Sequence, residues 1–238
     1  MKFSKRTIGV LTNLLKHQTA LVFKSGTVIR TMSESRSVFI EADLDEMMPS
    51  DVFVADGPAL VSALRLFDDP DVTFEARQMI ISSGSERLRF TYSDPSIQRK
   101  KMDPRILEAA SSQMMISNRK VDGAIKFTLG DEVIDRIQKG KAVVGATKLA
   151  VVAEAGAVRI EAYDHNNKTG SVYTYDLGTT DVPDVRYEYD LSSWVIIPGK
   201  YDVVVEPNGN NGTSTKLFGD RIRYVIGGLK RKVDRGAR

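Results

Sequence analysis

The segment that most constrains the fold of this chain is its first stretch, residues 1–16. Ser4 is a favoured helix N-cap residue, and apolar side chains then recur at Ile8, Leu11 and Leu15, the spacing of one face of an α-helix. The opposite face is polar, and its only charges are positive. Its members are Lys5, Arg6, Gly9, Thr12, Asn13 and Lys16. We predict an amphipathic helix whose basic side is either an ordinary solvated face or a surface that meets phosphate.

A second helix of this kind is expected at residues 130–139, in the other half of the chain. It combines an apolar stripe with Arg136 and Lys139, which point away from that stripe, and Lys141 follows it. Acidic residues on the same helix make its basic face less clear. The order of predicted elements also repeats, because each half reads as a helix, strands, a second short helix and three strands. Residue identity between the halves is negligible, so only the pattern repeats.

The long connection at residues 95–121 marks a domain boundary, since a connection of this length is uncommon within one compact domain. We therefore expect a first domain at 1–94, a second at 122–229 and a basic tail at 230–238. The connection and the tail each carry a net charge of +4, whereas the whole chain carries +3. The two domains are therefore acidic overall, and any nucleic-acid surface on them must be local.

Several classes of chemistry have no motif in this sequence. The chain has no cysteine, no glycine-rich phosphate loop and no dinucleotide fingerprint, and its two histidines, His17 and His165, lie far apart. No pair of carboxylates stands out as an acid and base. No apolar run is long enough to cross a membrane, and no signal peptide is visible. We therefore expect no enzyme activity, no cofactor, no metal site and no membrane partner.

Short motifs in a fixed order link the sequence to a known family. The opening Met1-Lys2-Phe3-Ser4-Lys5, then Lys24-Ser25-Gly26, Pro198-Gly199 and Phe218-Gly219 resemble the sliding clamps of T-even-type bacteriophages. The resemblance spans nearly the whole chain. It departs from the family in the connection, which is more basic and less rich in proline, and in the basic tail.

The resemblance implies an α+β DNA clamp fold, with two similar domains that each pack two short helices on antiparallel sheets. It also implies a homotrimeric ring that encircles double-stranded DNA and tethers the replicative DNA polymerase as a processivity factor. A separate ATP-dependent clamp loader would place the ring on DNA, in the cytoplasm of the infected bacterial host. Phosphate contacts alone suit this task, because they hold a protein on DNA without reading sequence and let it slide.

Two sets of candidate site residues follow. For the DNA channel we expect basic residues on the predicted helices. They are Lys5, Arg6, Lys16, Arg65, Arg136, Lys139 and Lys141. The resemblance also implies an apolar pocket for partner peptides beside the connection. Its candidates are Ile106, Leu107, Met114, Met115 and Leu229, for which plain core packing is an equal alternative.

Three other functions stay open at this point. The chain could be a DNA-binding processivity factor that forms no closed ring, or a β-rich structural virion protein with no DNA role. An enzyme that uses acidic residues on a β scaffold ranks last.

Overall fold

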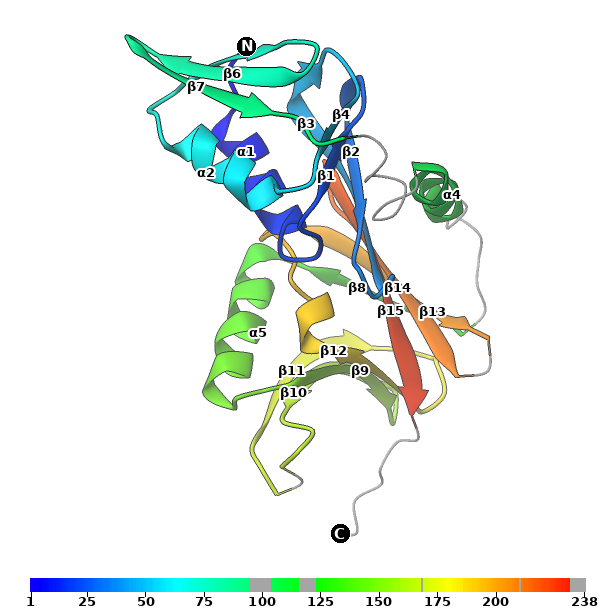
Figure 1. Ribbon diagram of the computed structural model, residues 1–238. Helices are drawn as coiled ribbons and strands as arrows, with labels where there is room; N and C mark the ends of the chain where they lie inside the picture. The colour runs from blue at the N-terminus through cyan, green and yellow to red at the C-terminus, as the bar shows by residue number, and fades with distance from the viewer. Residues whose placement is uncertain (95–103, 116–122, 168, 210, 232–238) are drawn as a thin grey trace. The chain divides into compact units, whose positions relative to one another are not determined.

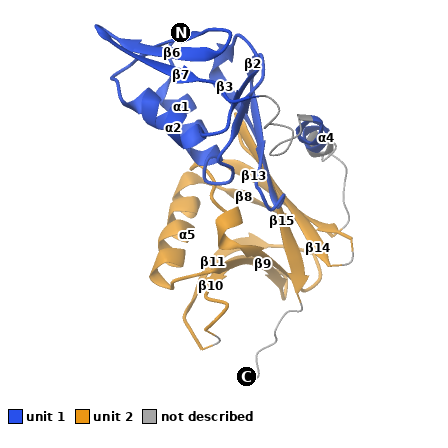
Figure 2. Cartoon of the chain, in the orientation of Figure 1, with its two compact units in different colours: residues 1–115 blue, residues 116–238 orange. Residues whose placement is uncertain are grey.

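The computed structural model describes residues 1–94, 104–115, 123–167, 169–209 and 211–231. The chain divides into two compact units, Met1–Met115 and Ile116–Arg238 (Figure 2). The division falls inside the connection predicted at 95–121. The basic cluster at residues 99–101 and the tail from residue 232 lie outside the described residues.

Among its described residues, the first unit combines three helices with two antiparallel sheets. Figure 1 labels these elements. Strands β3, β2, β1 and β4 are hydrogen-bonded neighbours in that order, and β5, β6 and β7 form a separate sheet. The elements are α1 (Lys5–Leu14), β1 (Leu21–Phe23), β2 (Gly26–Met32), β3 (Val38–Met48), β4 (Val52–Val54), α2 (Gly57–Arg65), β5 (Asp71–Phe74), β6 (Gln78–Ser83), β7 (Glu86–Thr91) and α4 (Pro104–Met115).

The second unit contains one α-helix, one short 3-10 helix and eight strands in the described part of the chain. Its strands follow the order β11-β10-β9-β12-β15-β14-β13-β8, and every pair is antiparallel. The elements are β8 (Ile125–Leu129), α5 (Asp131–Val143), β9 (Lys148–Glu154), β10 (Ala157–Tyr163), β11 (Val172–Thr179), β12 (Val185–Asp190), η2 (Leu191–Ser193), β13 (Tyr201–Asn208), β14 (Gly212–Phe218) and β15 (Ile222–Arg231).

The two units share one strand topology, which confirms the predicted repeat of pattern. In each unit a helix precedes a sheet in which the first strand pairs with the second and the fourth, as β1 does with β2 and β4 and β9 does with β10 and β12. Three further strands then pair in sequence, β5-β6-β7 and β13-β14-β15. The bridge between Lys2 and Asp71 is the counterpart of the β8–β13 pairing. The α+β class with antiparallel sheets is therefore confirmed.

Helix α1 begins where the sequence predicts it. The Ser4 hydroxyl accepts a hydrogen bond from the Thr7 N–H at 3.0 Å, as an N-cap does, and Leu11 and Leu14 are completely buried. Asn13 was expected on the polar face but is only 5% exposed. This expectation was wrong because α1 contacts both β3 and α2, so its buried surface is wider than one apolar stripe.

The helix pair of the first unit has only a short counterpart in the second. Helix α2 is capped by Asp56, which accepts a hydrogen bond from the Ala59 N–H at 3.0 Å. In the second unit the element at this point of the topology is the single turn η2, where the repeated pattern predicts a second short helix. Helix α5 packs mainly on β10 and β11. Because Gly140 has no side chain, the Tyr173 ring can pack against the helix there, whereas an added Cβ would lie 2.4 Å from that ring.

Candidate nucleic-acid interface

The exposed face of α1 carries a line of positive charge. Lys5 and Lys16 are exposed, and neither has an ion-pair partner among the described residues. Arg65 of α2 donates a hydrogen bond from its guanidinium Nη2 to the Thr12 Oγ1 at 2.8 Å. On a helical wheel Lys5, Thr12 and Lys16 fall within about 40° of one another. The Arg65 guanidinium therefore joins this line, and three of the predicted channel residues share one face of the first unit.

Arg6 takes a different direction from the other basic residues of α1. Its guanidinium donates to the Asp43 carbonyl oxygen at 2.7 Å and lies 3.1 Å from an Asp45 carboxylate oxygen. This end of β3 also anchors the start of α1, because the Glu46 carboxylate accepts hydrogen bonds from the Ser4 N–H and the Thr7 hydroxyl, both at 2.6 Å. The acidic end of β3 therefore draws Arg6 into the packing of α1.

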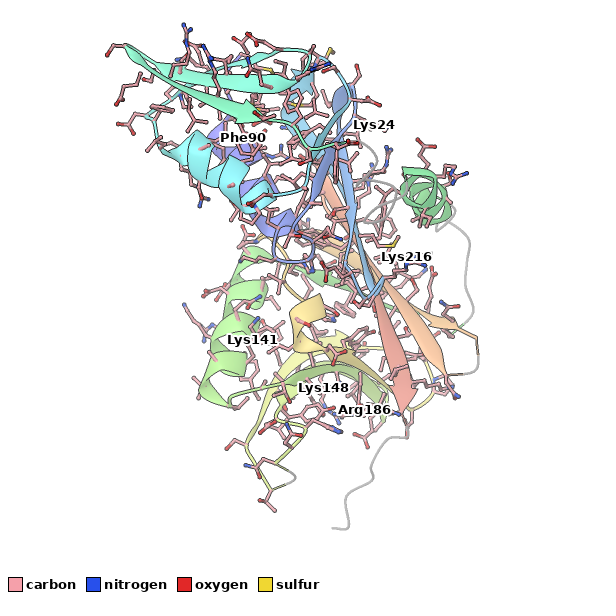
Figure 3. The ribbon with its side chains drawn as sticks, in the orientation of Figure 1. Lys24, Phe90, Lys141, Lys148, Arg186 and Lys216 are labelled. Carbon is pink, nitrogen blue, oxygen red and sulfur yellow. The ribbon has the colours of Figure 1, made fainter. Side chains whose placement is uncertain are left out.

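The basic residues of α5 stand beside acidic ones. Arg136 lies 3.8 Å from Glu132, and the Lys139 amine lies 2.6 Å from Asp135, each pair one helical turn apart. Lys141, labelled on α5 in Figure 3, lines a largely apolar hollow between α5 and η2. The rest of that lining is Leu129, Ile134, Ile137, Gln138, Leu149, Leu191, Trp194 and Ile196.

The predicted partner residues divide by exposure. Leu107 is 4% exposed, on a helix that contacts β2 and β3, whereas Ile106 on the same helix is 41% exposed and Leu229 on β15 is 50% exposed. Met114 and Met115 belong to α4, but their side chains lie outside the described residues.

A polar contact that the sequence reasoning missed holds α4 in place. The Ser111 hydroxyl donates to the Glu41 carboxylate on β3, and the same carboxylate lies 2.8 Å from the Arg30 guanidinium on β2. Arg30 and Glu41 are paired across the two strands. The alternation of Glu41 with buried Ile40 and Ala42 could have indicated that it faces away from the core, but no sequence signal links it to Ser111.

The described residues hold no group of three or more histidine, aspartate or glutamate side chains that could bind a metal ion. No helix in the described part of the chain is long and apolar enough to span a membrane.

Comparisons with known proteins agree with the architecture. No protein-family model matches the chain. The chain is 26% identical over 231 residues to the sliding clamp of Vibrio phage KVP40, covering 95% of this chain and 98% of the phage protein. It is 22% identical over 232 residues to the sliding clamp of Enterobacteria phage T4, covering 95% and 96% of the two chains.

The fold also matches clamps of known structure. PCNA from A. fulgidus, solved with the C-terminal region of FEN-1 bound, aligns with a TM-score of 0.61 at 12% identity. The alignment covers 99% of this chain and all of that one. Along nearly its whole length, and in the topology of its two units, the chain is similar to the sliding clamps of T-even-type bacteriophages.

Proposed function

We infer that this chain is a sliding clamp, which encircles duplex DNA and tethers the replicative DNA polymerase as a processivity factor. The observation that carries this function is the full-length similarity to phage sliding clamps, in a chain built from two units of the same clamp topology. The role is non-catalytic. A separate ATP-dependent clamp loader places the ring on DNA, in the cytoplasm of an infected bacterial host.

The charge distribution fits a protein that stays on DNA because its ring encloses the duplex, more than because it binds the duplex tightly. The chain has a net charge of only +3, and the Lys5–Lys16–Arg65 line is a local positive surface on helices. Phosphate contacts supply sequence-independent attraction and allow sliding. A closed ring needs no more than this, because escape requires a DNA end or an opened interface.

The direct test is retention on circular and linear DNA. Chains loaded on a nicked circular duplex should stay bound through gel filtration, and cutting the circle once should release them. The same chains should lengthen the products of the cognate polymerase when excess competitor template is present. Equal retention on circular and linear DNA would instead favour a processivity factor without a closed ring. Absence of both DNA retention and polymerase stimulation would favour a structural virion protein.

We propose that the ring is a homotrimer closed by β7 of one subunit and β11 of the next. Within the described residues β7 pairs only with β6, and β11 pairs only with β10, so each leaves one edge for another strand. The exposed side chains of β7 include Arg87 and Arg89, and those of β11 include Asp176. Complementary charges of this kind favour a head-to-tail contact that closes into a ring.

Charge reversal tests this interface. Light scattering of the parent chain should give three times the 26.4 kDa chain mass. Arg87→Glu/Arg89→Glu should dissociate at higher concentration than the parent, because like charges then face each other, and Asp176→Lys should behave similarly. The combined variant should recover most of the trimer. Independent, additive losses in the combined variant would reject the β7–β11 pairing, whereas a parent that is monomeric at all concentrations would reject the ring itself.

Partner peptides are proposed to bind beside α4, with exposed Ile106 as an apolar contact. Leu107 is buried on the same helix, and its packing holds α4 against β2 and β3. The proposal rests on the resemblance, which implies a partner pocket beside the connection that contains α4.

A further inference from the structure

We propose that the helices of the first unit hold the DNA phosphates, while α5 of the second unit contributes almost no attraction to them. This inference rests on the proposed clamp function and assigns its DNA contact to half of each chain. It starts from a difference in charge between two helices at equivalent points of the shared topology. Helix α1, with Lys16 following it, has only basic charged residues, whereas α5 has as many acidic as basic ones.

The charges of the first unit are arranged for an extended anion. Lys5 and Lys16 are separated by eleven positions, which corresponds to about 16 Å along a helix axis. The Arg65 guanidinium binds Thr12 between them at 2.8 Å. A phosphate backbone running along this line would meet three cations, of which Lys5 and Lys16 have no competing carboxylate among the described residues.

The acidic residues of α5 have a structural cause. Its N-cap is Gly130, which offers no side-chain hydrogen bond, whereas Ser4 and Asp56 cap α1 and α2. Asp131 and Glu132 stand in the first turn of α5, where negative charge stabilises the exposed N–H groups and the helix dipole. Asp131 and Glu132 therefore compensate for the side-chain cap that Gly130 lacks.

The ion pairs between residues four positions apart also stabilise helix α5. Glu132 precedes Arg136 and Asp135 precedes Lys139, the orientation that best stabilises a helix. Helix α1 needs no such pairs because α2 packs beside it, whereas the counterpart of α2 in the second unit is only the turn η2. The local stability of α5 thus depends on carboxylates that α1 can omit.

These carboxylates cancel the attraction of α5 for phosphate. The Asp135 carboxylate lies 2.6 Å from the Lys139 amine. This separation is far shorter than the Debye length of about 8 Å at physiological salt, so a phosphate near Lys139 experiences both charges. The same holds for Arg136, 3.8 Å from Glu132. Among the predicted channel residues of the first unit, Arg6 pairs with a carboxylate in the described part of the chain. The attraction of Lys5, Lys16 and Arg65 for phosphate is therefore not reduced by a neighbouring carboxylate.

Two matched variants of the full chain test the proposal through the salt dependence of binding to a short mixed-sequence duplex. Lys5→Gln/Lys16→Gln should weaken binding on the order of tenfold near 0.1 M salt, and should lower the slope of log K against log salt by about 0.9 for each phosphate that is no longer neutralised. The second variant is Glu132→Gln/Asp135→Asn/Arg136→Gln/Lys139→Gln, which keeps the net charge. It should leave both affinity and slope unchanged.

A third variant gives the opposite sign. Glu132→Gln/Asp135→Asn removes only the carboxylates, so it should strengthen binding and increase the salt slope. Solution mass and circular dichroism verify that each variant stays assembled and helical. An α5 quadruple variant that loses as much affinity as Lys5→Gln/Lys16→Gln would overturn the inference while leaving the clamp function intact. A parent chain that binds no duplex at low salt would also overturn the inference, whereas the clamp function is tested separately by retention on circular DNA.

Discussion

Replacing Arg186 by alanine is expected to lower the free energy of unfolding by about 3 kcal/mol, because it leaves carboxylates in a half-buried site without their cation. Arg186 lies on β12, as labelled in Figure 3. Its guanidinium lies 2.5 Å from Glu161 on β10 and 3.2 Å from Glu188 on its own strand. It also lies over the Tyr163 ring, 5.0 Å from its centroid. These side chains cross the strands of the second unit on the face opposite buried Tyr187.

The control for Arg186→Ala is an exposed ion pair of similar length. Lys24 lies 2.7 Å from Asp51, with side chains 42% and 59% exposed, whereas those of Arg186 and Glu161 are 18% and 13% exposed. Lys24→Ala should lose less than about 1 kcal/mol, because water already screens this pair. Urea unfolding followed by far-ultraviolet circular dichroism measures both variants. Equal losses would show that the Arg186 cluster adds nothing beyond a surface ion pair.

The same cluster predicts how stability changes with acid. Burial alone would raise the pKa of Glu161, but hydrogen bonds from Arg186 and Arg159 outweigh it and hold this pKa below its usual value. The pKa of Glu188 is lowered in the same way, against burial, by bonds from Tyr163, Arg186 and Arg231. A carboxylate with a depressed folded pKa stabilises the fold above its unfolded pKa of about 4.3.

This contribution is lost as the pH falls through the depressed folded pKa values. Stability should therefore decline below about pH 4.3 in the parent. The decline should be smaller in Arg186→Ala, because that variant no longer holds the two pKa values as low. Unfolding midpoints measured across this acid range compare the two proteins, and identical acid profiles would contradict the assignment.

Replacing Leu11 by alanine is the second large expected loss, about 3 kcal/mol, from lost transfer free energy and the cavity left in the core. Leu11 is completely buried at the centre of α1, where the helix contacts β3 and α2. The loss should appear as a lower urea midpoint. Because Lys5 lies on this helix, Lys16 follows it and Arg65 contacts its Thr12, DNA retention should fall at temperatures where the variant begins to unfold.

The matched control lies on the solvent side of the same helix. Gly9 is exposed, and a Cβ added there would have no neighbouring atom within 4 Å. Gly9→Ala should raise stability by about 0.5–1 kcal/mol, because alanine loses less backbone entropy in a helix than glycine does. A loss at Gly9 comparable to that at Leu11 would mean that the exposed face of α1 is covered by something in the assembled protein.

The sequence alone determined the elements that depend on local rules. The Ser4 cap, the apolar spacing of α1, the turn at Gly26 and the helix after Gly130 all follow from neighbours within one or two turns of chain. The order of short motifs also indicated the resemblance to phage sliding clamps and hence the clamp fold. The segment at 104–115, predicted only as part of a connection, carries a local helix signal as well: Pro104 is the first residue of α4, a position where proline is well tolerated.

Only the tertiary structure decided which basic side chains of α1 remain free of a carboxylate from a distant strand. Arg6 and Lys5 are adjacent in sequence and equally basic, yet Arg6 meets Asp45, 39 positions away, while Lys5 stays exposed. Ser111 meets Glu41 across 70 positions. Periodicity reports which side of an element is apolar, but an ion pair depends on which distant strand lies opposite it. Strand pairing therefore withdrew Arg6 from the basic face of α1, whereas the carboxylates beside Arg136 and Lys139 lie one turn away on α5 and could be read from the sequence.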